Sequence, residues 1–102
     1  MTDKEWRTAF IEYLANKGYS EYTPSGLPST ATNYANRIDR IRTAADCEAG
    51  ISWEKLSKVI HNLIPIYDKG GAKAHIGAIS HNAIINAMKR FAEFVKETQI
   101  KQ

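Results

Sequence analysis

The 102-residue sequence has one cysteine, three prolines and no long apolar run. With Cys47 alone, no disulfide can form within the chain, which is typical of a reducing intracellular setting. No stretch approaches the ~20 apolar residues of a membrane-spanning helix. The opening MTDKEW also lacks the basic start and apolar core of a signal peptide. We therefore expect a cytoplasmic protein that does not contact a membrane.

Recognisable catalytic and metal-binding motifs are absent from the sequence. His61, His75 and His81 share no zinc-like spacing with one another or with Cys47, which is most simply a packing residue. No HExxH motif, Walker loop or dinucleotide fingerprint occurs, and the Gly-rich segment 69–73 lacks the strand and the Gly-Lys-Ser/Thr ending of a phosphate-binding loop. We expect no metal, no cofactor and no enzymatic activity, since no acid, base and nucleophile site can be assembled.

Size and charge fit one small domain, residues 1–102, with a basic bias. The chain is 43% hydrophobic and 25% charged, with a net charge of +3. Residues 1–28 hold three Lys/Arg against four Asp/Glu, so residues 29–102 hold eleven against seven. A polyanionic partner is compatible with this distribution, although inert domains are often as basic.

Four helices are predicted, at about 3–17, 30–46, 53–66 and 81–98. The first has a Thr2–Glu5 capping box and a stop at Gly18, and Ser29 or Thr30 can cap the second. The intervening segment 19–29 is rich in Pro, Gly, Ser and Thr and is expected to be a turn-rich loop. No period-two strand pattern occurs, so the fold class is all-α.

Caps and breakers also delimit the last two helices. Ser52 can cap the third helix, which Pro65 should end or kink near Leu63 or Ile64. The connection 68–79 is expected to be mobile because of its glycine pair. Ser80 can cap the fourth helix, with Ile79 and Ile84 as a hydrophobic staple.

Helical wheels separate an apolar from a polar face on the second and fourth helices. The second helix has a core arc of Ala31, Tyr34, Ile38, Ile41 and Ala45. Its polar flank carries Asn33, Asn36, Arg37 and Arg40, while Asp39 and Asp46 lie on the other side. The fourth helix has an inner stripe of Ile84, Ala87, Met88, Phe91, Phe94 and Val95. Its outer face has Asn82, Asn86, Lys89, Glu93 and Lys96, with Arg90 on the flank. The aromatic residues Trp6, Tyr34, Trp53 and Phe91 are expected to anchor the core.

Polar faces of this composition suit DNA. Arg and Lys bind phosphates or guanine edges, and Asn can pair with adenine in the major groove. For one isolated helix, charges that merely solvate an outer face are the commoner explanation. Two such faces, each poor in acids, narrow the gap between this explanation and the DNA hypothesis without closing it.

Residues 7–98 resemble the N-terminal core-binding, SAM-like domain of phage integrases and other tyrosine recombinases. The residues that carry the resemblance are Phe10-Ile-Glu-Tyr-Leu-Ala-Asn-Lys-Gly18, Thr30-x3-Tyr34 and Asn86-Ala-Met-Lys-Arg-Phe-Ala-Glu-Phe-Val95. The resemblance implies a four-helix orthogonal bundle that covers one side of double-stranded DNA through its second and fourth helices. Catalysis would belong to a separate C-terminal domain, so this chain should position recombination-site DNA without cutting it.

By this resemblance, the candidate DNA contacts lie on the second and fourth helices: Thr30, Asn33, Arg37, Arg40, Asn82, Asn86, Lys89 and Arg90. The implied partners are duplex DNA, the C-terminal catalytic domain of a parent recombinase and further copies on DNA. Residues 96–102 look like the start of an interdomain linker. The alternative is a stand-alone helical protein-interaction module or small regulator from a phage or mobile element.

Overall fold

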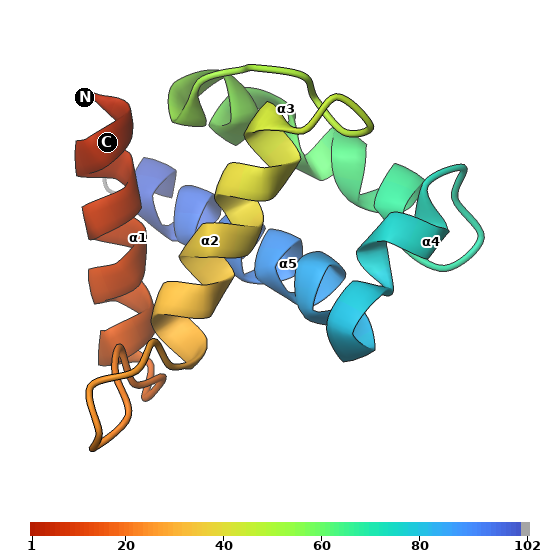
Figure 1. Ribbon diagram of the computed structural model, residues 1–102. Coiled ribbons are helices and arrows are strands. Elements are labelled where there is room, and N and C mark those ends of the chain that lie inside the picture. Colours follow the sequence, from red (N-terminus) through yellow and green to blue (C-terminus); the bar gives the residue numbers. More distant parts are fainter. Residues whose placement is uncertain (101–102) are drawn as a thin grey trace.

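The computed structural model describes the backbone of residues 1–100 and the side chains of residues 1–98. This part of the chain contains helices and no strand, which confirms the all-α class (Figure 1). The helices are α1 (Asp3–Asn16), α2 (Thr30–Thr43), α3 (Trp53–Tyr67), α4 (Ala74–Gly77) and α5 (Ile79–Ile100). The four-residue α4 was not predicted, and it lies in the connection expected to be irregular and mobile. Of the expected linker segment 96–102, residues 101–102 lie outside the described part.

Helix α1 begins and ends close to the predicted bounds. The Thr2 N–H donates to Glu5 Oε1 (2.8 Å) and the Glu5 N–H donates to Thr2 Oγ1 (3.2 Å), so the predicted capping box is formed. At the other end Gly18 has φ 101°, a left-handed conformation that favours glycine and stops the helix. Phe10 and Leu14 are fully buried, which fixes the inner face of α1.

Helix α2 ends at Thr43 and not at residue 46 as predicted. Ala44 is extended (φ −68°, ψ 140°), and the Glu48 N–H then donates to the Ile41 carbonyl as the chain turns back. The helical wheel therefore fails beyond Thr43. Ala45, expected in the core arc, is exposed, and Asp46, expected on the far side from Arg40, lies 3.5 Å from it.

Helix α3 continues through Pro65 to Tyr67, so the predicted end near Leu63 or Ile64 was wrong, whereas the predicted range 53–66 stops one residue short. Ser52 caps its start as predicted, accepting a hydrogen bond from the Lys55 N–H (3.0 Å). Pro65 leaves the carbonyl of His61 without its helical donor, and both residues are exposed, so water can hydrate that carbonyl. The free-energy cost of a proline inside the helix is therefore smaller at this exposed position than it would be in a buried turn.

Helix α5 does not begin with the predicted Ser80 cap. Ser80, His81 and Asn82 all have left-handed backbone angles, with φ of 56°, 57° and 68°, and right-handed helix follows them. Three consecutive non-glycine residues in this region are unusual, because each costs roughly 1–2 kcal/mol. The left-handed residues lie in the first turn of α5, directly after α4.

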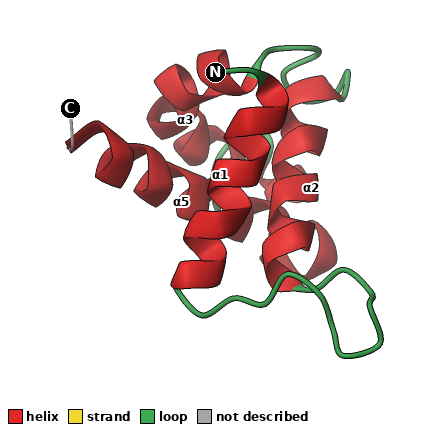
Figure 2. Cartoon of the chain, turned by 90° about the vertical axis from the view of Figure 1, so that its left-hand side faces the viewer, coloured by secondary structure: helices red, strands yellow, loops and turns green. Residues whose placement is uncertain are grey.

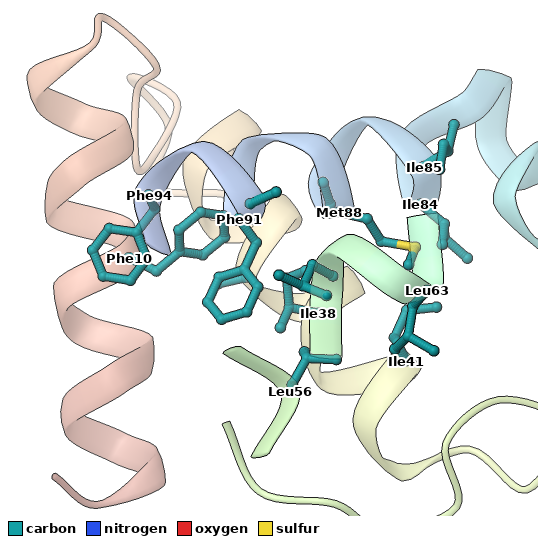
Figure 3. Packing of buried hydrophobic residues seen from close by; sticks show 14 of the residues in the cluster. Phe10, Ile38, Ile41, Leu56, Leu63, Ile84, Ile85, Met88, Phe91 and Phe94 are labelled. Carbon is teal, nitrogen blue, oxygen red and sulfur yellow. The ribbon is translucent and has the colours of Figure 1, made fainter. Parts of the chain in front are cut away.

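The core lies where α5 packs against α1, α2 and α3 (Figure 3). The ring of Phe91 lies 5.4 Å from the rings of both Phe10 and Trp53, measured between centroids. All members of the predicted inner stripe of α5 are buried. Trp6 and Tyr34, predicted to be core anchors, are only half-buried at its edge. Burial at ~25 cal/mol per Å² of apolar area is the main force holding these helices together.

Candidate nucleic-acid interface

The outer face of α2, here meaning Thr30, Asn33, Arg37 and Arg40, is amide-rich and cationic. In Figure 1 this helix crosses over α5 on the side toward the viewer. Thr30 and Asn33 are exposed, and Arg37 and Arg40 are half-buried. Within the described part of the chain, the side chains of Thr30 and Asn33 make no hydrogen bond. Their polar groups are therefore available to a ligand.

The one carboxylate within α2, Asp39, is held on the opposite flank. Its Oδ2 accepts from Arg7 Nη1 (2.7 Å), and its Oδ1 accepts from Arg42 Nη2 (2.7 Å) and from the buried indole N–H of Trp53 (3.0 Å). These contacts join α1, α2 and the start of α3. Arg7 also donates to Asn36 Oδ1 (2.7 Å), so it bridges Asp39 to the predicted polar flank. A second carboxylate, Asp46, contacts Arg40 on the outer face of α2.

Arg37 connects the outer face of α2 to the start of α5. Its Nη2 donates to Ser80 Oγ at 3.2 Å. Among the four predicted cations, Arg37 is the one without a carboxylate partner in the described part of the chain. Because a hydroxyl does not neutralise it, its positive charge is open to an anion.

The other three predicted cations each contact a carboxylate of this chain. Arg40 Nη2 lies 3.5 Å from Asp46 Oδ2, Lys89 Nζ lies 3.1 Å from Asp68 Oδ2, and Arg90 Nε lies 2.9 Å from Glu93 Oε2. All three pairs are partly exposed, so each contributes little to stability and can exchange its carboxylate for a phosphate. Periodicity along single helices could not predict the first two pairs, because Asp46 and Asp68 lie beyond the helices that carry their partners.

The predicted α5 contacts divide between two places. Asn82, Asn86 and Lys89 line a cleft beside α4 and the end of α3. Arg90 instead lies in a second hollow with Tyr13, Lys17 and Tyr19. A hydrogen bond to Tyr19 and the nearby Glu93 raise the pKa of Arg90 above its usual value, against the opposing effect of burial. Arg90 therefore has protein partners on both sides.

The loop between α1 and α2 forms a projecting hairpin that sequence reasoning predicted only as a turn (Figures 1 and 2). The Thr23 N–H donates to the Leu27 carbonyl (2.7 Å), and the Leu27 N–H donates to Thr23 Oγ1 (3.1 Å). Thr32 Oγ1 donates to the Glu21 carbonyl (2.7 Å) and ties the hairpin to α2. The side chains of Tyr22 and Leu27 are left 60% and 64% exposed. The Pro, Gly and Ser content indicated the turn but not this exposed apolar pair.

The remaining nucleophilic and metal-binding side chains are dispersed. Cys47 is buried, and burial raises the pKa of its thiol. His61, His75 and His81 are exposed. Among residues 1–98 no three His, Cys, Asp or Glu side chains gather as metal ligands would. None of the described helices combines the length and the apolar character needed to span a bilayer.

Comparisons of the chain with family models, with curated proteins and with solved structures found no match.

Proposed function

We propose that this protein binds double-stranded DNA and places the outer face of α2 against the phosphate backbone. The proposal is carried by one observation, that Arg37 has no carboxylate partner in the described part of the chain. Phosphates supply the larger share of affinity in such complexes. Thr30 can donate to phosphate, and Asn33 can reach a base edge.

In its finer form, the proposal is that of the core-binding domain of a tyrosine recombinase with a four-helix, SAM-like arrangement. Support comes from the crossing of α2 over α5 and from the order of the helices, with α4 as a short addition. The chain would position recombination-site DNA for a C-terminal catalytic domain and would not itself cut the strand. Figure 2 shows the last turns of α5 leaving the body of the molecule, a direction suited to such a partner domain.

The test is the salt dependence of binding to a fluorescein-labelled duplex, followed by anisotropy. The affinity should fall by about 0.9 logarithmic units per logarithmic unit of salt for each phosphate neutralised. Arg37→Ala/Arg40→Ala should weaken binding and lower that slope by about two. Lys55→Ala/Lys58→Ala removes the same charge from exposed positions on α3 and serves as the matched control.

Two results would count against duplex binding by α2. An affinity that does not change with salt would show that the protein makes no contacts with phosphates. Equal losses in the α2 and α3 variants would mean that only net charge matters. The α3 variant should melt near the wild-type temperature, since exposed-site changes usually stay within about 0.5 kcal/mol. The α2 variant also loses contacts with Ser80 and Asp46, so circular dichroism must show that it is folded at the temperature of the binding assay.

A protein-interaction module is the second candidate, and the exposed pair Tyr22 and Leu27 favours it. An exposed tyrosine on a projecting hairpin is the kind of side chain that is enriched among the residues that dominate binding at protein interfaces. Reading the gene downstream of codon 102 discriminates between the two. A following catalytic domain favours the recombinase, whereas a stop codon together with no DNA binding at low salt favours the module.

A further inference from the structure

The cleft beside α4 has the make-up of a small-molecule site. It lies where the end of α3, α4 and the first turns of α5 meet, at one end of the molecule (Figure 1). Its volume is about 400 Å³, within the range of about 300–1,000 Å³ typical of ligand pockets. Tyr67 and Ile85 are buried and form an apolar base, with Ala78 beside them.

The exposed members of the cleft are amides and ammonium groups. Asn82 and Asn86 each offer one acceptor and two donors. Lys69 and Lys89 contribute two positive charges, and Asp68 contributes one negative charge. Asp68 is already engaged, because its Oδ1 accepts from the Lys69 N–H (2.8 Å) and its Oδ2 lies 3.1 Å from Lys89 Nζ. These contacts lower the pKa of Asp68, so it stays ionised and the cleft keeps one net positive charge.

The left-handed turn at the start of α5 is an independent feature of the same place. Asn82 is its last residue (φ 68°) and lines the cleft beside Asn86. Asparagine tolerates this conformation better than most residues. Strained backbone of this kind recurs at ligand sites, where surrounding structure holds it.

We propose that this cleft binds one adenine nucleotide. The adenine ring lies against Tyr67, Ala78 and Ile85. The carboxamides of Asn82 and Asn86 pair with its adjacent donor and acceptor, as Asn does with adenine edges in DNA. The phosphate lies near the ammonium groups of Lys69 and Lys89. A free nucleotide and an unpaired adenine in a DNA strand offer the same chemistry.

This site is independent of duplex binding by α2, although three predicted duplex contacts, Asn82, Asn86 and Lys89, line it. If the α2 proposal fails, the nucleotide site still stands. Arg40→Ala, which leaves the Arg37–Ser80 contact in place, should weaken duplex binding and leave nucleotide binding unchanged, so the two failures are distinguishable.

The experiment is a ¹H–¹⁵N NMR titration of the full chain with AMP, CMP and inorganic phosphate. AMP should shift the side-chain amides of Asn82 and Asn86 and saturate at a lower concentration than the other two. Asn86→Ala should weaken AMP binding roughly tenfold or more, the loss expected for a bidentate contact. Asn62→Ala, at an exposed asparagine of α3 outside the cleft, should leave it unchanged.

A DNA hairpin with one unpaired adenine, compared with its fully paired counterpart, identifies the source of the ligand. Tighter binding of the unpaired hairpin than of its paired counterpart, with shifts of the Asn82 and Asn86 side-chain amides, points to a DNA strand. AMP binding without such shifts from the unpaired hairpin points to a free nucleotide. The proposal is overturned if AMP gives no saturable shift at millimolar concentration. Equal responses to AMP and phosphate also overturn it, since they show an anion site alone.

Discussion

Replacing Asp39 by Ala should destabilise the protein far more than its partial exposure suggests. The carboxylate is 32% exposed, but it is the acceptor for Arg7, for Arg42 and for the indole N–H of Trp53. Trp53 is 1% exposed, so its N–H would lose its partner in a buried place, at about 1–3 kcal/mol. Arg42 keeps the Ile51 carbonyl at 2.8 Å, which limits the further loss.

We expect a total loss of about 3 kcal/mol for Asp39→Ala, after discounting the ion pairs for solvent screening. For a domain of this size that corresponds to a drop in Tm of roughly 12–24 °C. Thermal unfolding followed by circular dichroism measures it. Asp39→Asn keeps one oxygen acceptor and should lose about half as much. The matched control is Asp46→Ala, whose carboxylate is 59% exposed and 3.5 Å from Arg40. If Asp39→Ala melts as close to wild type as that control, the joining role of Asp39 is wrong.

Three further predictions concern backbone and thiol chemistry. Gly77→Ala should lower the free energy of unfolding by about 2 kcal/mol in urea titration, because the new Cβ would clash with the Tyr67 carbonyl oxygen. Alanine ordinarily favours helix, so equal stability would show that Gly77 and Tyr67 do not approach so closely. His81→Gly should raise stability by about 1 kcal/mol in the same assay by relieving a left-handed conformation; a loss would mean that His81 does not adopt it. Burial raises the pKa of Cys47, so its stabilising effect is complete below the unfolded thiol value of about 8.5 and is lost as pH rises through the folded value. Stability should therefore fall above about pH 8.5 and less steeply in Cys47→Ala, and an identical decline in both would contradict the assignment.

Local sequence signals predicted the helices well where the signal is a helix cap or the apolar stripe of a single helix. The Thr2–Glu5 box, the Ser52 cap and the inner stripe of α5 depend on residues three or four positions apart, and the structure bears them out. Pro65 was misjudged because the consequence of a lost hydrogen bond depends on whether water reaches the freed carbonyl. Exposure of that kind is a tertiary property.

The predictions that failed concern how segments meet. Ser80 has the residue pattern of a cap, yet the preceding α4 packs against α3 and α5, and the chain passes between them through a left-handed turn. The carboxylate contacts of Arg40 and Lys89 show the same limit in the candidate site. Both carboxylates lie beyond the helices of their partners, on chain segments whose path only the folded chain defines.

The most direct test of the DNA proposal is an NMR map of the surface that a duplex contacts. A fully paired duplex added at low salt should shift the signals of Asn33, Arg37 and Arg40 and leave those of Tyr22, Leu27 and α3 residues Lys55 and Lys58 in place. Shifts concentrated on the hairpin, or none at all, would contradict duplex binding through α2.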